Sequence, residues 1–249
     1  MIVLKTPGEI EVLRVVNRAV AEVLKELESK IRPGISTLEL DELAEKLLRE
    51  RDCIPAFKGY RGYPKSICTS INEQIVHGIP SERKLKEGDI ISIDIGAKYR
   101  DFFGDMAATY PVEKISGSAQ RLLDVTRESL CEGIAMAKGG NRLGDISSAI
   151  QRTVEKEGFS VVRFFVGHGI GRELHEMPQI PNFGIPGTGV RLKSGMVFAI
   201  EPMVNAGDND VEVLDDGWTA VTKDKSLSAH FEHTIVILEK GPEILTKTN

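Results

Sequence analysis

The sequence predicts an α+β fold built from two related halves, each a pair of helices followed by β-strands. Two blocks of the chain carry apolar residues at helical spacing, and the apolar–polar alternation typical of strands follows each block. One pattern also recurs, because LKEGDIISID at 85–94 resembles LKSGMVFAIE at 192–201. We therefore expect a single domain over residues 1–249, with halves of roughly 1–115 and 116–249. Chance similarity between two strands that each follow a Lys-x-Gly turn is the alternative.

The composition is that of an ordinary globular protein and excludes several classes. Of 249 residues, 41% are hydrophobic and 28% are charged, which excludes disordered, collagen-like and low-complexity chains. No apolar run approaches the roughly 18 residues of a membrane-spanning helix, and the N-terminus has no signal-peptide pattern. Three cysteines without a CxxC pair predict free thiols and a cytoplasmic location. The net charge of −5 argues against a nucleic-acid substrate.

Four helices are predicted. The first two cover residues 7–30 and 37–51, and each follows a capping box, in which a hydroxyl residue is followed three positions later by glutamate. The second half repeats this arrangement, with helices near 118–137 and 143–157. The two capping boxes are Thr6 with Glu9 and Ser36 with Glu39.

Strands follow each helical pair. Residues 66–76 alternate as one strand, and residues 89–110 predict a β-hairpin in which Ser92, Asp94 and Gly96 share a face. In the second half, residues 196–200 and 235–238 predict apolar strands. The Pro- and Gly-rich residues 177–189 are expected to be a long loop that forms the wall of a cleft.

Two acids of the predicted hairpin, Asp94 and Asp105, are candidate ligands. If Tyr99-Arg100 is a two-residue loop, the two acids are direct cross-strand partners with Cβ atoms about 4.5–5.5 Å apart. Carboxylates so close repel each other unless one is protonated or a cation lies between them. With a longer turn both acids face solvent instead, so these two residues alone leave metal binding and a plain surface role equally open.

A glycine-rich stretch, GHGIGRELHE at 167–176, contains two of the five histidines. Glycines on both sides of His168 remove side-chain bulk, which lets backbone or ligand approach closely. A single histidine on an apolar strand is more often a core residue than a ligand, but the second one, His175, favours a site. Their spacing of seven excludes the HExxH zinc-helix motif.

Two glutamates lie at the ends of apolar strands. Glu201 ends the strand at 196–200, where a carboxylate is costly to bury unless it is paired or bound to a metal. Glu232 precedes the last strand and shares a face with His230 and Thr234. Either acid alone could be a strand-end residue near solvent.

Four carboxylates and one imidazole together suit a pair of divalent cations. Mn, Co, Fe and Zn all tolerate such oxygen-rich ligation. Two metals about 3.5–4 Å apart can activate a bridging hydroxide and polarise a carbonyl, which is hydrolase chemistry. The candidate ligands are Asp94, Asp105, His168, Glu201 and Glu232.

These residues lie in motifs that resemble the type I methionine aminopeptidases, metallopeptidases of the pita-bread fold. The resemblance implies two pseudo-twofold-related halves around a curved, mainly antiparallel sheet with helices on its outer face. It also implies metal-dependent removal of the N-terminal methionine when the second residue is small. The similar stretches cover essentially the whole chain: NEQIVHGIP (72–80), SIDIG (92–96), GDMA (104–107), GHGIGRELHEMPQIPN (167–182), FAIEPM (198–203), DGWTAVTKDKSLSAHFEHTI (216–235) and EILT (243–246).

The family's functional residues carry over onto matching positions. The resemblance implies two metal ions on the five candidate ligands, with Glu201 also acting as general base. It implies that His175 donates to the scissile carbonyl oxygen and that His77 holds the amide nitrogen. The positions that line the methionine pocket match Tyr60, Tyr63, Cys68, Leu174 and Trp218, with Phe57 nearby.

Three positions depart from the family pattern. Leu174 stands where an aromatic residue is common, Gly96 where many relatives have threonine, and Arg61 where histidine is frequent. These departures leave the details of the pocket and the choice of metal open.

Two other functions are considered. A proline-directed aminopeptidase or dipeptidase shares the five ligands but usually carries an additional N-terminal domain, for which 249 residues are expected to leave no room. A non-catalytic pita-bread binding module would typically lose ligands. The preferred enzyme is expected to be a cytoplasmic monomer that acts on nascent chains beginning with methionine. Such a substrate suggests association with ribosomes, with no role for nucleic acid as substrate or for a membrane.

Overall fold

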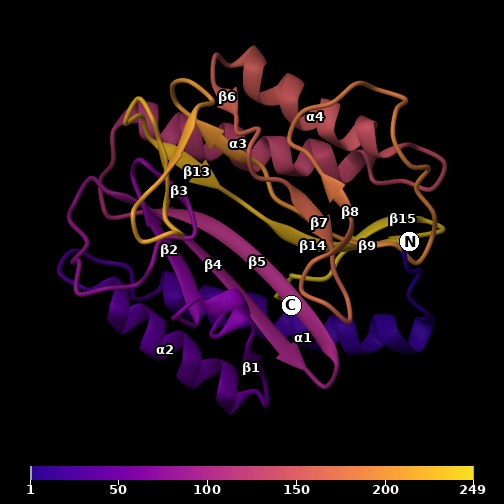
Figure 1. Cartoon of the computed structure of the whole chain (residues 1–249), viewed down its shortest axis with the longest axis horizontal. Helices are drawn as coiled ribbons and strands as arrows, with labels where there is room; N and C mark the ends of the chain where they lie inside the picture. The colour runs from indigo at the N-terminus through magenta and orange to yellow at the C-terminus, as the bar shows by residue number, and fades with distance from the viewer. Residues whose placement is uncertain (1, 249) are drawn as a thin grey trace.

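The computed structural model describes residues 2–248, and these form four α-helices and four β-sheets (Figure 1). The helices are α1 (Pro7–Glu28), α2 (Thr37–Glu50), α3 (Gly117–Met136) and α4 (Leu143–Lys156). The first strands are β1 (Ile54–Pro55), β2 (Ile67–Ile71), β3 (Gln74–Val76), β4 (Ile90–Tyr99) and β5 (Phe102–Pro111). The later strands are β6 (Ser160–Val161), β7 (Gly167–Gly169), β8 (Glu176–Ile180), β9 (Val197–Ile200), β10 (Met203–Asn205), β11 (Val211–Val213), β12 (Ala220–Thr222), β13 (Ser228–His230), β14 (His233–Leu238) and β15 (Gly241–Ile244).

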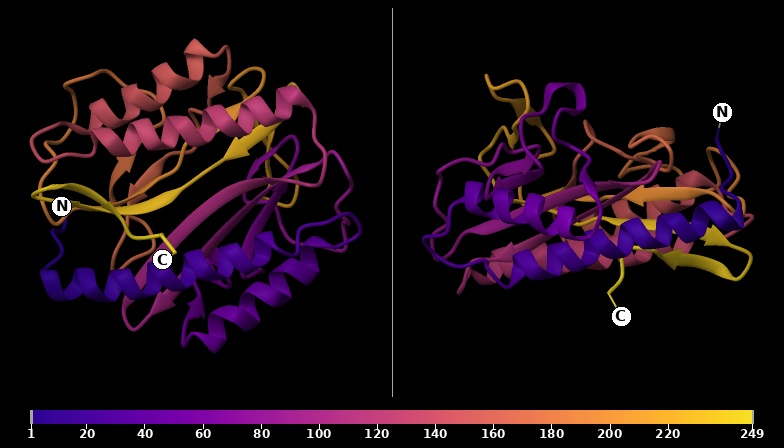
Figure 2. Two further views of the ribbon diagram at one scale, coloured as in Figure 1. Left: turned by 180° about the vertical axis from the view of Figure 1, so that it is seen from behind. Right: turned by 90° about the horizontal axis from the view of Figure 1, so that it is seen from below.

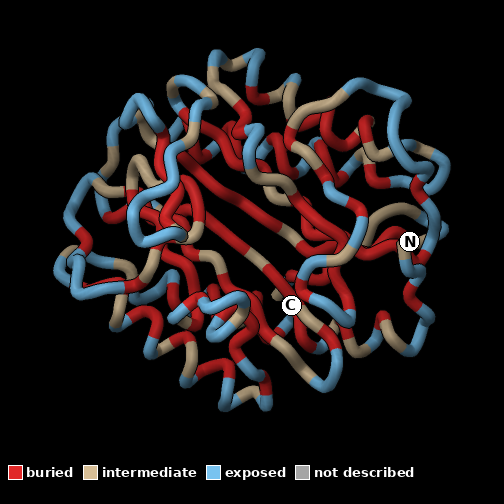
Figure 3. Tube along the Cα trace, viewed as in Figure 1, coloured by how far each residue is buried: buried red, intermediate tan, exposed pale blue. Residues whose placement is uncertain are grey.

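The helices cover one face of the strands. In Figure 1, β5 crosses in front of α1 and β13 in front of α3, whereas the view from behind in Figure 2 shows these helices in front. The central strands between them are buried along most of their length (Figure 3). Within the described residues, no helix combines the length and apolarity needed to cross a membrane.

The predicted helices are confirmed, and local signals explain where they begin. In the first capping box the backbone N–H of Thr6 donates to Glu9 at 2.9 Å, and in the second that of Ser36 donates to Glu39 at 2.7 Å. The apolar stripe of α1 packs against β4 and β5, and Leu13 is fully buried. Each such buried leucine stabilises the fold by about 1.5–3 kcal/mol.

Equivalent hydrogen bonds hold the repeated segments of the two halves. The N–H of Gly34 donates to Leu85 at 2.9 Å, and the N–H of Gly140 donates to Leu192 at 3.1 Å. Both glycines have left-handed φ angles, +89° and +95°, which side chains disfavour. Leu85 and Leu192 begin the two similar stretches, and each is buried. The second helix of each half is thus tied to the strand that brings in a candidate ligand.

The register of the β4–β5 hairpin differs from the predicted one. Tyr99 pairs with Phe102, so the two-residue loop is Arg100-Asp101 rather than Tyr99-Arg100. Arg100 takes the positive φ, +52°, that a tight hairpin loop requires. As a result Asp94 lies opposite Ala107 and Asp105 lies opposite Gly96. The prediction of direct cross-strand partners was wrong, although the two acids remain diagonal neighbours on one face.

Other strand predictions also need correction. Residues 66–76 form two strands, β2 and β3, because Asn72 adopts a φ of +57° and turns the chain between them. The predicted loop 177–189 begins inside β8, which pairs with β7 at the edge of the five-stranded sheet β15-β14-β9-β7-β8. The last strand starts at His233 and is followed by β15, which the sequence did not reveal.

Candidate active site

The five candidate ligands converge on one cavity of about 160 Å³. Strand register brings them together from distant parts of the chain. Asp94 and Asp105 come from the hairpin β4–β5, His168 from the middle of β7, and Glu201 follows β9 directly. Glu232 lies between β13 and β14, where its N–H donates to the carbonyl of Ala107 at 2.8 Å.

His168 presents its Nε2 atom to the neighbouring acids. Its Nδ1 lies 2.9 Å from the carbonyl oxygen of Gly169, which requires a proton on Nδ1 and leaves Nε2 with a free lone pair. Nε2 lies 3.5 Å from Glu201 Oε1 and 3.9 Å from Asp105 Oδ2. One ligand atom each from Asp105, His168 and Glu232 lie within 4.8 Å of one another.

Asp105 and Glu232 are buried, Asp94 and Glu201 are half-buried, and none of the four pairs with a lysine or arginine of the described chain. Burial raises the pKa of Asp94 to about 7 and that of Glu201 to about 8. Burial, followed by repulsion from neighbouring carboxylates, raises the pKa of Asp105 and of Glu232 well above the usual range. In each of Asp94, Asp105 and Glu232 one buried oxygen has no hydrogen-bond donor. Such oxygens fit divalent cations, which would satisfy them and compensate the concentrated charge.

His77 is held in a strained position beside the cavity. Its φ of +62° lies in the left-handed region, which non-glycine residues adopt mainly where the surrounding structure enforces it. The ring packs edge-on against Phe165, with centroids 5.1 Å apart, and against Trp218 at 6.4 Å. Burial lowers the pKa of His77 to about 4, so the ring is neutral near pH 7.

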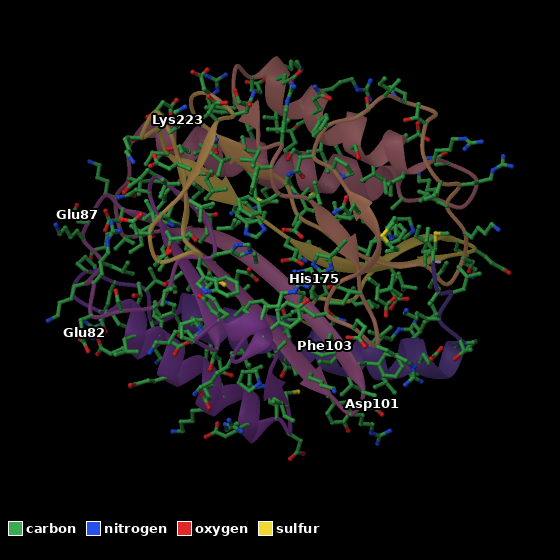
Figure 4. All side chains as sticks on the ribbon, viewed as in Figure 1. Glu82, Glu87, Asp101, Phe103, His175 and Lys223 are labelled. Atoms are coloured by element: carbon green, nitrogen blue, oxygen red, sulfur yellow. The ribbon has the colours of Figure 1, made fainter. Side chains whose placement is uncertain are left out.

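His175 is more exposed than the ligands but still lines the cavity. The Tyr60 hydroxyl lies 2.9 Å from His175 Nδ1, and the two rings stack with centroids 5.3 Å apart. Desolvation, and then the charge of Arg61, lowers the pKa of His175. His175 lies near the centre of the view in Figure 4. The centroid of its ring is 4.3 Å from the centroid of the His168 ring.

The residues predicted to bind methionine also line this cavity. Cys68 pairs directly with Asp94 across β2 and β4, which places its thiol beside the carboxylates. The ring of Tyr63 packs edge-on against Trp218 at 5.0 Å. The apolar and aromatic lining residues are Phe57, Tyr60, Tyr63, Cys68, Leu174 and Trp218.

The structure shows what surrounds two of the residues that depart from the family pattern, Gly96 and Arg61. A Cβ atom on Gly96 would lie 2.5 Å from Cε1 of Phe57, so the Phe57 ring occupies the space that a side chain at position 96 would need. Arg61 has a φ of +49° and stacks on the Tyr60 ring at 5.3 Å, at the edge of the cavity.

The glycines on either side of His168 allow close approach of neighbouring backbone in the sheet, and not of a ligand. A Cβ on Gly167 would lie 2.5 Å from the carbonyl oxygen of Ala199, and one on Gly169 would lie 2.4 Å from that of Met177. Close backbone approach was therefore predicted correctly. The expectation that residues 177–189 form the cleft wall was wrong, because the lining residues lie outside this range and β8 is held in the sheet.

His230 is a site neighbour that sequence reasoning did not single out. Its Nε2 lies 3.5 Å from Glu201 Oε2, so the Glu201 carboxylate is flanked by imidazoles on both oxygens. The His230 backbone is clamped to the hairpin, because its N–H donates to Thr109 Oγ1 at 2.9 Å. The predicted alternation placed His230 on the face of Glu232, and that pattern was the available signal.

Comparison with known proteins defines the class. The model of a family described as Metallopeptidase family M24 matches residues 11–239. Prolidase from Pyrococcus furiosus has the same fold, with a TM-score of 0.77 at 23% identity over 99% of this chain and 66% of that chain. The chain therefore belongs to metallopeptidase family M24, whose pita-bread fold carries these sheets and helices.

Within this family the chain is similar to methionine aminopeptidases over nearly its whole length. It is 57% identical to methionine aminopeptidase 1 of Bacillus subtilis, over 99% of this chain and 100% of that protein. It is 49% identical to the Escherichia coli K12 enzyme, over 98% and 93% of the two chains. The crystal structure of methionine aminopeptidase from Thermotoga maritima matches with a TM-score of 0.98 at 53% identity, over 100% of both chains.

Proposed function

We propose that this protein removes N-terminal methionine from peptides and nascent proteins, using two divalent cations. The observation that carries the proposal is the convergence of five ligand side chains, with unsatisfied carboxylate oxygens, beside a soft apolar cavity. Relatives at 49–57% identity over almost the whole chain are named methionine aminopeptidases. A binding module would not need this concentration of buried charge next to two neutral histidines.

Asp94, Asp105, Glu201 and Glu232 would hold the cations through carboxylate oxygens, and His168 through Nε2. Bound cations would activate water and polarise the scissile carbonyl. The donor set admits Mn, Co, Fe or Zn, because it mixes four hard carboxylates with one imidazole. The hydrogen bond from His168 Nδ1 to Gly169 keeps the ring oriented for this role.

Glu201 is the proposed general base. Its carboxylate lies at the end of β9, with His168 Nε2 3.5 Å from one oxygen and His230 Nε2 3.5 Å from the other. It accepts a proton from the attacking water on a carboxylate oxygen. It then returns that proton to the amine nitrogen that leaves when the peptide bond breaks.

His175 and His77 orient the substrate. With the Tyr60 hydroxyl, 2.9 Å away, as donor to Nδ1 of His175, the ring proton would reside on Nε2, and Nε2–H would donate to the scissile carbonyl oxygen as its negative charge develops. Neutral His77 contacts the amide nitrogen at the cleavage point. Its ring packs edge-on against Phe165 and Trp218, and in this position it would limit the second residue of the substrate to small side chains.

The apolar lining selects methionine. Aromatic edges and a thiol contact a thioether favourably, and such side chains line the cavity. We expect the enzyme to act as a cytoplasmic monomer on nascent chains, near the ribosome. A proline-directed activity is the competing function, since prolidases share the fold.

A peptide panel tests the proposed function. The protein is loaded with Mn²⁺, Co²⁺, Fe²⁺ or Zn²⁺ in turn and given Met-Ala, Met-Lys, Leu-Ala and Ala-Pro peptides, with bound metal measured by mass spectrometry. Release of methionine from Met-Ala alone, with two metal equivalents bound, is expected. Cleavage of Ala-Pro with no cleavage of Met-Ala would establish the competing function.

A further inference from the structure

Lys5 is a buried lysine outside the cavity, just before α1. Its side chain is 1% exposed, and its Nζ lies 2.5 Å from Oε2 of Glu176, whose side chain is 14% exposed. Lysine is almost never fully buried unless it is paired. The segment that carries it is itself anchored, because the N–H of Lys5 donates to the carbonyl of Gly195 at 2.7 Å. We call residues 4–9 the N-terminal strap.

Glu176 directly follows His175 and organises the turn that carries it. Its Oε1 accepts the backbone N–H of Arg172 at 2.8 Å and that of Glu173 at 3.4 Å. One carboxylate therefore closes the turn with one oxygen and binds the strap with the other. Leu174 and His175, which lie inside this turn, both line the cavity.

The strap and the turn fit each other closely. A Cβ on Gly171 would lie 2.3 Å from Cε of Lys5, so the lysine side chain occupies the space that a side chain at position 171 would need. Arg172 adds an ion pair to Glu9 of the strap at 3.1 Å and lies over the Phe102 ring at 4.6 Å. The far side of the turn is tied to the hairpin, because Phe103 donates its N–H to the carbonyl of Gly171 at 2.8 Å.

We propose that Lys5 and Glu176 form a positioning pair that sets the location of His175 from the N-terminal strap. The inference rests on the proposed function, in which His175 donates to the scissile carbonyl. The pair does not touch the substrate, and it acts only by fixing the turn. A displacement of about 1 Å in such a donor can reduce the rate by about 10²-fold.

The test compares Lys5→Met with Arg14→Met in the full-length, metal-loaded protein. Arg14 is the matched control, because its guanidinium binds Glu243 at 2.7 Å and joins α1 to β15 without contact to the turn. We measure kcat and KM on a Met-Ala peptide, metal content and the thermal midpoint. Lys5→Met should lower kcat by about 10²-fold, with KM within about twofold and metal content unchanged. Arg14→Met should lower the thermal midpoint and leave kcat unchanged.

A double-mutant cycle separates positioning from general destabilisation. If Lys5 acts through His175, Lys5→Met should cost little further activity in a His175→Ala background. Glu176→Gln keeps an acceptor for the turn but loses the ion pair, and it should reproduce the Lys5→Met kinetics. In NMR spectra of the protein, the imidazole ¹⁵N signals of His175 should shift in Lys5→Met and not in Arg14→Met.

The possible outcomes distinguish failure of the positioning role of Lys5 from failure of the proposed role of His175. An unchanged kcat in Lys5→Met, or an equal loss in both backgrounds, would overturn the positioning role. If His175→Ala alone left kcat intact, the proposed role of His175 would fail instead. The NMR comparison would then still show whether Lys5 sets the position of that ring.

Discussion

The Tyr60 hydroxyl lies 2.9 Å from Nδ1 of His175, and the direction of this hydrogen bond is coupled to which nitrogen of the ring carries the proton. Nδ1 has one lone pair when the proton is on Nε2. A hydroxyl donor at Nδ1 therefore selects the tautomer that the proposed reaction needs. Tyr60 was predicted only as a wall of the methionine pocket, so the structure adds a second use for it.

Tyr60→Phe tests this use, because it keeps the ring and removes the hydroxyl. We expect kcat to fall about tenfold, the equivalent of about 1.4 kcal/mol, which is the scale of one neutral hydrogen bond. KM should change less, because the ring still stacks on His175. Tyr99→Phe, at the hairpin end outside the cavity, is the control. Equal kinetics for the two variants would argue against the tautomer role.

His175→Ala and His168→Ala should have different effects, the first on kcat and the second on metal content. Loss of one donor to a developing oxyanion typically reduces kcat by about 10²–10³-fold. His175→Ala should therefore lower kcat by that factor, hold KM within a small factor and keep normal metal content. His168→Ala should lose metal first, as measured by mass spectrometry. The reverse pattern would exchange the two roles.

Asp105→Asn and Glu232→Gln test whether two cations bind. Each variant keeps the size of the side chain and loses a carboxylate from the most crowded part of the cluster. We expect the second metal equivalent and nearly all activity to disappear. Full activity with one equivalent in either variant would contradict a two-metal centre.

Gly96→Ala should damage the pocket through Phe57. The added methyl would lie 2.5 Å from Phe57 Cε1, and overpacking of this kind costs about 1–3 kcal/mol. We expect a raised KM for Met-Ala peptides and a lower thermal midpoint, with recovery in the double variant Gly96→Ala, Phe57→Leu. Gly117→Ala is the control, because its Cβ meets nothing within 4 Å. A normal KM for Gly96→Ala would show that the Phe57 ring moves freely.

Removal of metal should make stability depend on pH in a defined direction. The pKa of Asp94 is raised from 3.8 to about 7 and that of Glu201 from 4.5 to about 8. An acid whose pKa is higher in the folded state binds its proton more tightly there. Its contribution to stability is therefore complete below the unfolded pKa and lost as pH rises through the folded one.

The useful window lies above about pH 7.5, where buried histidines such as His77 are neutral in both states. Between about pH 7.5 and 9 the thermal midpoint of the chelated protein should fall, and added Mn²⁺ should restore it most at the high end. Circular dichroism melts at several pH values provide the measurement. A midpoint that stays level with pH in the presence of chelator would contradict the assignment of a cation-compensated acid cluster.

The features that the sequence determined by itself are the helix starts and strand faces, which depend on local residues, and the site residues, which lie in motifs. The capping boxes at Thr6 and Ser36 set the starts of two helices, because a hydroxyl and a glutamate three residues apart satisfy the first free N–H groups without help from the rest of the chain. Alternation placed Asp94 and Gly96 on one face. The motifs selected all five candidate ligands and both histidines, which the folded chain brings to one cavity.

Only the tertiary structure decided relationships between distant segments. The hairpin register depends on Arg100 taking a positive φ, and a shift of the loop by one residue moved Asp105 from opposite Asp94 to opposite Gly96. The strand β8 forms because its backbone pairs with the free edge of β7, and no signal inside residues 177–189 reveals this pairing. Tyr60 meets Nδ1 of His175, and Lys5 pairs with Glu176 of the neighbouring turn, 171 positions further along the chain. Such contacts arise from packing between elements, and local propensity does not encode which elements meet.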